Sequence, residues 1–207
     1  MSNVGDIERV TQDRIIKLFK DQLKYEYLGN WTDRTNKNIE PNLLKKFLQK
    51  QGTSEKLIER ALRVLDQAAA IGDGRSLYDA NKEVYRFLRY GIKVKEDAGD
   101  QNQTVWLFNW AEPDKNDFAI AEEVTVKGEN TKRPDVVLYI NGIAIGVIEL
   151  KRSTVGLTEG IRQNLLNQRK DFIRPFFTTM HLVMAGNDTQ GLRYGTIETI
   201  EKYYLEW

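Results

Sequence analysis

Cysteine is absent from the 207 residues, and histidine occurs once, at His181. Without cysteine the chain can form no disulfide and no thiolate zinc site, and it has no cysteine nucleophile. A single histidine leaves no basis for a histidine-rich metal site or a histidine relay. If the chain is an enzyme, its chemistry therefore rests on carboxylates, lysines, hydroxyls and bound hard cations.

Long apolar runs are also missing. No segment approaches the ~20 apolar residues of a membrane helix, and the first ten residues lack the apolar centre of a signal peptide. We therefore expect a cytoplasmic protein with no membrane partner. The length and the 41% content of hydrophobic residues suit one soluble domain, with or without an insertion.

An excess of charge of one sign is missing too, since 31 Lys and Arg face 30 Asp and Glu for a net charge of +1. The charge is nevertheless uneven along the chain. Residues 94–126 hold eight acids and two lysines, whereas residues 151–174 hold six basic residues and two acids. A local basic face of this kind could bind phosphates, although imbalances of this size are also common on solvated surfaces.

The first half of the chain is predicted to be helical. Apolar residues recur at helical spacing over 7–27 and in the segments that follow Pro41, Ser54 and Ser76. Proline suits the first turn of a helix, and the two serines suit helix N-caps. Glycines mark the breaks between these segments.

The second half changes to the period of strands, with one helix among them. The runs that flank Asn141-Gly142 are apolar on both faces, which is typical of central strands joined by a tight hairpin. The order of elements predicts a mixed α/β sheet with helices packed on it. Strands are expected at 104–110, 118–126, 135–140, 143–150, 178–185 and 192–197, and a helix at 157–173.

Three ionisable residues interrupt the predicted hairpin: Asp135 begins its first strand, and Glu149 and Lys151 end its second. Burying such groups is costly unless they are paired or bind a cation. Two converging carboxylates would offer oxygen ligands to Mg²⁺, and the lysine could stabilise charge on a phosphate. This set is the equipment of metal-assisted phosphodiester hydrolysis. The alternative is a structural salt bridge between Glu149 and Lys151.

The register of the hairpin tests this metal-site hypothesis. A regular two-residue turn at Asn141-Gly142 would place Asp135 opposite Ile148, so that Asp135 and Glu149 would face opposite sides of the sheet. The hypothesis therefore predicts an odd offset, such as a glycine bulge at Gly142 or a distortion near Pro134.

Pro134-Asp135 followed by Glu149-Leu150-Lys151 resembles the PD-(D/E)xK nuclease motif. More narrowly, the run RPDVVLYINGIAIGVIELKRSTVGLTEGIRQN resembles the N-terminal nuclease domain of the R (restriction) subunit of type I restriction-modification enzymes. TQDRIIKLF and FFTTMHLVMAGNDTQGLRYGT extend the likeness over most of the chain. The resemblance implies a single restriction-endonuclease-like α/β domain over 1–207, a fragment of a longer subunit. Its mixed-sheet core, flanked by helices, would comprise 1–30 and 104–207, with a helical insertion at about 40–90.

The resemblance also implies roles for individual residues. Asp135 and Glu149 correspond to the Mg²⁺ ligands of the family, and Lys151 to its catalytic lysine. Gln163 matches the glutamine of a Gln-x-x-x-Tyr pattern on the next helix, where Asn167 occupies the tyrosine position.

Weaker site candidates lie on neighbouring elements. The place of an acidic residue on the first helix of the family is taken by Gln12, which could hydrogen-bond a metal-bound water. Glu122 and Glu123 lie on the strand before Asp135; one of them, with Glu123 as the weak candidate, could face the site, and pairing on a sheet edge is the equally good alternative.

The helix after the motif offers a possible DNA contact. Gln163, Asn167 and Lys170 share a face at helical spacing, with Arg162 and Arg169 beside it. Such a face could follow a DNA backbone without reading sequence, although a solvated helix face would look the same.

The resemblance implies Mg²⁺-dependent endonucleolytic cleavage of double-stranded DNA, the reaction of a type I site-specific deoxyribonuclease. Cutting would be coupled to ATP-driven translocation by C-terminal motor domains absent from this chain, and methyltransferase (M) and specificity (S) subunits would be partners. The P-loop pattern G-x-x-x-x-G-K-[ST] does not occur here, so ATP would be bound outside this chain. The alternatives are a non-catalytic module that docks DNA or subunits, or another PD-(D/E)xK DNA nuclease.

Overall fold

The computed structural model describes residues 4–72 and 74–207, with side chains from Glu8 onward. Its centre is a mixed sheet of seven described strands in the order β1-β4-β5-β6-β7-β8-β9. β1 pairs with β4 and β6 with β7 in parallel, and the other neighbours are antiparallel. The strands are β1 (Glu26–Asn30), β4 (Phe118–Glu122), β5 (Val136–Ile140), β6 (Ile143–Leu150), β7 (Leu182–Asn187), β8 (Gly191–Gly195) and β9 (Leu205–Glu206).

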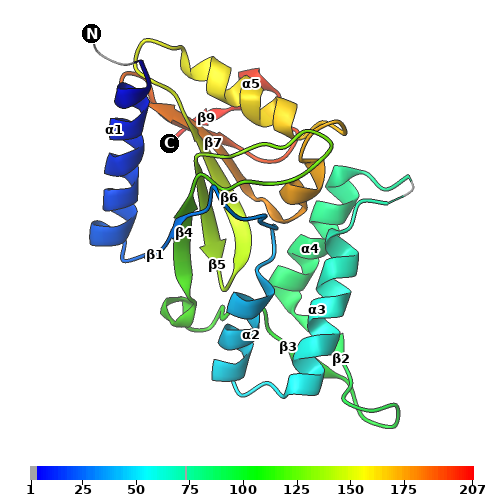
Figure 1. Cartoon of the computed structure of the whole chain (residues 1–207). Helices are drawn as coiled ribbons and strands as arrows, with labels where there is room; N and C mark the ends of the chain where they lie inside the picture. The colour runs from blue at the N-terminus through cyan, green and yellow to red at the C-terminus, as the bar shows by residue number, and fades with distance from the viewer. Residues whose placement is uncertain (1–3, 73) are drawn as a thin grey trace.

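Helices cover both faces of this sheet (Figure 1). α1 (Val4–Lys17), which runs on into a π-helical turn (Leu18–Gln22), packs on one face; α5 (Leu157–Asn167) and a 3₁₀ segment (Arg174–Thr179) pack on the other. The side chains of β5 and β6 alternate between the two layers, as the period of a strand requires. Val136, Leu138 and Ile148 join the α1 side, and Val137, Tyr139 and Val147 join the α5 side. The expected mixed α/β architecture is confirmed.

A second core lies beside the sheet, at the lower right of Figure 1. It is built from α2 (Pro41–Lys50), α3 (Glu55–Ala69) and α4 (Leu77–Tyr90) with the small β2 (Ile92–Val94) and β3 (Gln103–Val105) sheet, and it includes Ile143 of β6. The expected helix starts are confirmed: Pro41 is in the first turn of α2, and the hydroxyl oxygens of Ser54 and Ser76 accept backbone N–H groups of α3 and α4. That this region is an insertion remains a prediction.

Several expected boundaries are wrong at their ends. The helix expected over 7–27 stops early because Lys24 adopts a left-handed backbone (φ +59°), after which β1 begins at Glu26. Val10, Leu18 and Leu23, expected on its apolar stripe, are exposed.

In the second half, the strand expected at 104–110 continues only to Val105, and the strand expected at 118–126 ends at Glu122. The helix expected at 157–173 ends at Asn167, whose carbonyl accepts the Ile173 amide at 3.2 Å and so closes a turn. The strand expected from Thr178 begins at Leu182, since the 3₁₀ segment precedes it, and the last expected strand ends at Gly195. Among the described helices, none is long and apolar enough to cross a bilayer.

The hairpin between β5 and β6 contains the odd offset that the metal-site hypothesis requires. Ile140 pairs with Ile143 across a two-residue turn, in which Asn141 and Gly142 have φ values of +53° and +82°. Tyr139 then pairs with Ala144, but Leu138 pairs with Gly146, so Ile145 is an extra residue in β6. The expected location of the offset, at Gly142 or Pro134, is wrong, because a β-bulge inside β6 supplies it.

The turn predicts a stability effect that separates backbone strain from crowding. A Cβ at Gly142 would need a left-handed backbone and would lie 2.6 Å from the Leu43 Cβ and 2.9 Å from the Glu40 carbonyl oxygen. Gly52 is also left-handed, but a Cβ there meets nothing within 4 Å. We expect Gly142→Ala to lower the free energy of unfolding by about 3 kcal/mol and Gly52→Ala by about 1 kcal/mol, measured by urea denaturation. Equal losses would show that crowding at the turn is unimportant.

Candidate active site

Asp135, Glu149 and Lys151 come together at one end of the central strands. Val136 pairs with Ile148, so Asp135, which precedes β5, lies across from Glu149. Glu149 is 1% exposed, and its Oε1 accepts a hydrogen bond of 2.8 Å from the Lys151 Nζ. The backbone amide of Leu150 donates to the Asp135 Oδ2 at 2.6 Å, which fixes that carboxylate beside β6. The structure thus groups the three residues that the sequence singled out.

The electrostatics of this group show that two carboxyl groups share a desolvated space. Burial, helped by the nearby Asp135 charge, raises the pKa of Glu149 to about 8, although Lys151 opposes the change. Burial likewise raises the pKa of Asp135 to about 6, against the Leu150 amide and Lys151. Burial alone would lower the pKa of Lys151, but the two carboxylates outweigh it and raise that pKa. Such a set is costly in the absence of a further positive charge.

The donor set fits a hard divalent cation. The second oxygen of Glu149, Oε2, is buried and has no hydrogen-bond partner in the described part of the chain. A free carboxylate oxygen next to a second carboxylate is what Mg²⁺ coordination needs. No three Asp, Glu, His or Cys side chains of the described residues gather closely enough to hold a metal ion by themselves. A Mg²⁺ ion here would therefore complete its coordination with water and substrate oxygens.

α5 covers the lysine through a close approach at Gly160. A Cβ at Gly160 would lie 3.1 Å from the Ala185 Cβ and 3.4 Å from the Lys151 Cγ. Gln163, three residues further along α5, is half-buried. Among the described residues no hydrogen bond joins Gln163 to Asp135, Glu149 or Lys151, so its role remains a prediction.

The weaker candidates form a network beside the site. The Gln12 amide donates to the Glu122 Oε2 at 2.9 Å and to the Glu123 Oε1 at 3.1 Å. Glu123 has a left-handed backbone (φ +52°), its amide donates to the Asp135 carbonyl at 2.9 Å, and its charge contributes to the raised pKa of Asp135. Arg133 neutralises the Glu123 carboxylate at 2.6 Å. Gln12 therefore binds the neighbours of Asp135 rather than Asp135 itself.

One acidic residue near the site was missed at the sequence level. The charge of Glu8, on α1, makes a small contribution to the raised pKa of Asp135, Glu149 and Lys151, so Glu8 lies within electrostatic range of the three groups. Glu8 lies one helical turn before Gln12, on the same side of α1. That four-residue spacing is the signal that could have revealed it.

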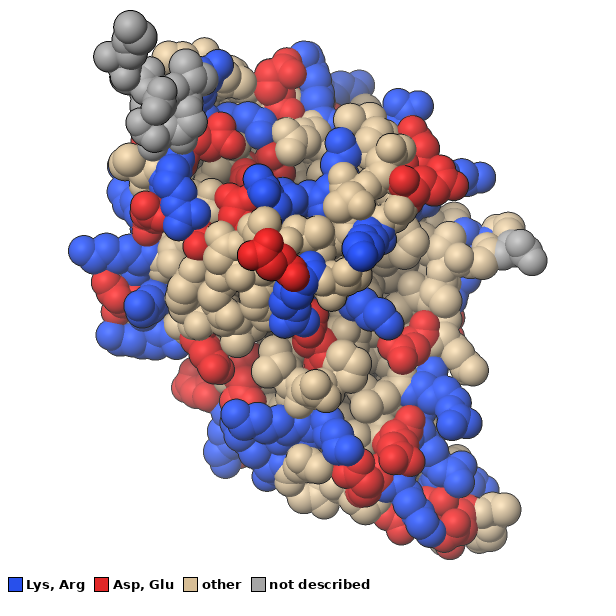
Figure 2. Space-filling model, in the orientation of Figure 1, with Lys and Arg blue, Asp and Glu red and all other residues tan. Residues whose placement is uncertain are grey.

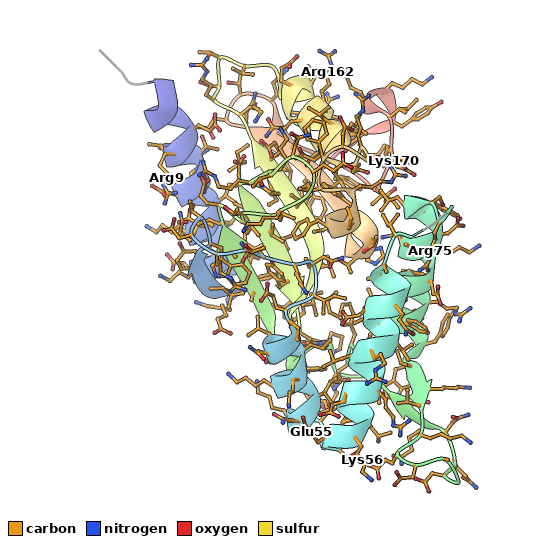
Figure 3. All side chains as sticks on the ribbon, turned by 45° about the vertical axis from the view of Figure 1, so that its right-hand side comes forward. Arg9, Glu55, Lys56, Arg75, Arg162 and Lys170 are labelled. Atoms are coloured by element: carbon orange, nitrogen blue, oxygen red, sulfur yellow. The ribbon has the colours of Figure 1, made fainter. Side chains whose placement is uncertain are left out.

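The DNA-contact face expected on α5 is not continuous. Asn167 is 2% exposed, so its side chain cannot reach a DNA backbone, and Lys170 lies beyond the end of the helix. Arg162 is engaged by Glu159 at 2.9 Å and Glu201 at 2.8 Å. Arg169 and Lys170 are exposed, and Figure 3 shows Lys170 well apart from Arg162.

The raised pKa of Glu149 predicts a pH-dependent loss of stability in metal-free protein. A carboxyl group whose folded pKa exceeds its unfolded value stabilises the fold below the unfolded pKa, and this contribution is lost as the pH rises. For Glu149 the loss runs from about pH 4.5 to about pH 8. We expect Glu149→Gln to gain stability over the unsubstituted chain across this range, by about 1 kcal/mol or more at pH 8, in urea denaturation with EDTA. Parallel pH profiles would contradict the buried carboxylate pair.

Comparisons with known proteins identify the family. Residues 8–202 match the family model for the type I restriction enzyme R protein N terminus. A type I restriction enzyme SauMSSORF170P endonuclease subunit of Staphylococcus aureus (strain MSSA476) is 23% identical over 194 residues, which cover 90% of this chain and 19% of the relative. A putative MjaVIIIP endonuclease subunit of Methanocaldococcus jannaschii is 36% identical over 74 residues, or 34% of this chain and 7% of the relative.

The chain spans about 19% of the length of the first of these relatives. The family match extends over nearly all of the described residues and includes the whole candidate site. The resemblance drawn from the motif is therefore confirmed, and the chain belongs to the family of type I restriction enzyme R protein N-terminal domains.

Proposed function

We propose that this chain is the nuclease domain of a type I restriction enzyme R subunit and hydrolyses phosphodiester bonds of double-stranded DNA. The observation that carries the proposal is the β6 bulge, which brings Asp135 across from Glu149 while the Glu149 Oε2 keeps no partner among the described residues. A purely structural salt bridge between Glu149 and Lys151 would need neither the second carboxylate nor the free oxygen.

In this proposal Asp135 and Glu149 hold Mg²⁺, which supplies Lewis-acid polarisation of the phosphate and lowers the pKa of bound water. Lys151, already a donor to Glu149 at 2.8 Å, stabilises charge on a phosphate oxygen or holds the attacking water. The Leu150 amide keeps Asp135 in place. Gln163, on the helix above Lys151, orients the lysine or the DNA backbone.

The remaining parts of the reaction lie outside this chain. The curated relatives are named endonuclease subunits and are about five times longer than the segment matched here. We propose that motor domains elsewhere in the subunit bind ATP and translocate DNA, that M and S subunits supply methylation and site recognition, and that the complex works in the cytoplasm. Cutting by this domain then needs no sequence preference of its own.

The assembled complex provides the test of catalysis. We expect Asp135→Ala and Lys151→Ala in the full subunit, combined with M and S subunits, to reduce cleavage of circular DNA by more than about a hundredfold, because each removes a group that acts on the scissile phosphate. ATP-driven translocation should continue, since the motor is untouched.

Lys56→Ala is the matched control, because Lys56 is exposed on α3, at the far end of the molecule from α5 (Figure 3). The complex that carries this variant should cut at the normal rate. Retained cutting by the Asp135 or Lys151 variant would refute the assignment. It would favour a module that only docks DNA or partner subunits.

Metal binding can be tested on the isolated chain. We expect calorimetric titration with Mn²⁺ to show binding that Glu149→Gln weakens by more than about tenfold, because the free carboxylate oxygen is removed. Glu55→Gln removes an exposed carboxylate on α3 and should leave the titration unchanged. Equal affinities in the two variants would place the metal elsewhere.

A further inference from the structure

Two short basic segments are joined in the chain to elements of the candidate active site. They are residues 127–133, in the loop between β4 and β5, and residues 169–174, which follow α5; together they hold six Lys or Arg and two acids. We call them the loop pair. The first leads through Pro134 into Asp135, and the second follows the helix that packs on Lys151. Figure 1 shows the loop crossing in front of the sheet toward the turn after α5.

The two segments are held together by a close backbone approach and by side-chain contacts. Gly128 lies so close to Phe172 that a Cβ would be 2.1 Å from the Phe172 carbonyl oxygen. The side-chain Nδ2 of Asn130 donates to the Asp171 carbonyl at 2.6 Å, and the Lys132 Nζ lies 4.5 Å from the centre of the Phe172 ring. Val126 and Lys132 exchange two backbone hydrogen bonds, which close the base of the loop. The charges of the loop pair are therefore carried on an ordered support.

Two of the six cations already serve the fold. Arg133 pairs with Glu123 at 2.6 Å, next to Asp135. Arg174 pairs with Glu198 at 2.8 Å and also donates to the Gln168 carbonyl. These arginines hold the loop pair in place, and their guanidinium groups are already paired with carboxylates of the fold.

The lysines are different. Lys127, Lys132 and Lys170 form no ion pair with any described residue, and Arg169 reaches Asp171 only at 4.0 Å. Lys127 and Lys170 are exposed, and Lys132 is half-buried over Phe172. Figure 2 shows cations and acids interspersed over this face, so unpaired cations rather than total charge decide where an anion binds.

We infer that the loop pair binds the phosphate backbone of the DNA substrate, through Lys127, Lys132 and Lys170. This inference rests on the proposed nuclease function, which supplies the identity of the anion. Phosphate contacts give affinity and position without reading sequence. Lys132 lies three residues before Asp135, and this short connection would lead the bound backbone toward the metal site. The loop pair thus replaces the α5 face expected from the sequence.

The test measures binding without cleavage. The 207-residue chain is titrated with fluorescent duplexes of about 30 bp in EDTA, over about 50 to 200 mM KCl. The variant Lys127→Gln, Lys132→Gln, Lys170→Gln should weaken binding by about tenfold or more at the lowest salt. It should also reduce the slope of log K against log salt by about 0.9 for each phosphate that the variant no longer neutralises. The weakening should be the same for two unrelated DNA sequences. An unchanged affinity and slope would overturn the inference.

A matched control removes equal charge from a second basic cluster, which lines a cavity on α3 and β2 away from α5. Arg63→Gln, Lys93→Gln, Lys95→Gln should leave affinity within about twofold, and equal weakening in both variants would overturn the inference as mere non-specific attraction. Gly128→Ala, which keeps every charge but forces the segments apart, should also weaken binding. The binding titration contains no divalent ion, so its outcome does not depend on catalysis. Cutting by the complex that carries Asp135→Ala would refute the nuclease proposal but would leave the measured DNA affinity unchanged.

Discussion

The extra residue in β6 determines which way the end of that strand faces. With Ile145 bulged out of the ladder, Val136 pairs with Ile148, and Asp135 and Glu149 reach the same side of the sheet. Without it the two carboxylates would diverge, and Lys151 would have one acidic neighbour instead of two. The grouping of the three residues follows from this one irregularity in the ladder, and so does the part of the raised Glu149 pKa that comes from Asp135; burial is the larger cause of that shift.

The site is arranged at the expense of stability. Two carboxylates are held in a desolvated space with one lysine, and the only direct ion pair among the three leaves the Glu149 Oε2 without a partner in the described chain. A salt bridge selected for stability would satisfy both oxygens. Around this group several polar contacts are formed: the Leu150 amide binds Asp135, while Gln12 and Arg133 bind Glu123. The surroundings thus hold both carboxylates in place, as the proposed cation site requires.

Local sequence signals predicted several of these elements correctly. The errors come from contacts between residues that are far apart in the chain. Pro41, Ser54 and Ser76 mark helix starts, and Asn141-Gly142 marks the hairpin, because each acts through its own backbone. The need for an odd offset followed from the positions of Asp135 and Glu149. Its place did not, because a bulge depends on packing against residues far along the chain.

Burial on short helices was harder to foresee. Asn167 looked like part of an exposed polar face, but α5 ends there and the side chain is enclosed. Conversely, the sequence did not single out Lys127 and Lys132, and only the contacts of Gly128 and Lys132 with Phe172 connect their loop to the segment that carries Lys170. Only the position of α1 against the sheet identifies Glu8 as a neighbour of the site.

The most direct test of the central claim is a crystal of this chain soaked in Mn²⁺, with the anomalous signal of the metal mapped. The account predicts one peak bridged by the carboxylates of Asp135 and Glu149, with the Glu149 Oε2 as a ligand. A peak that excludes either carboxylate, or no peak at this end of the sheet, would contradict it.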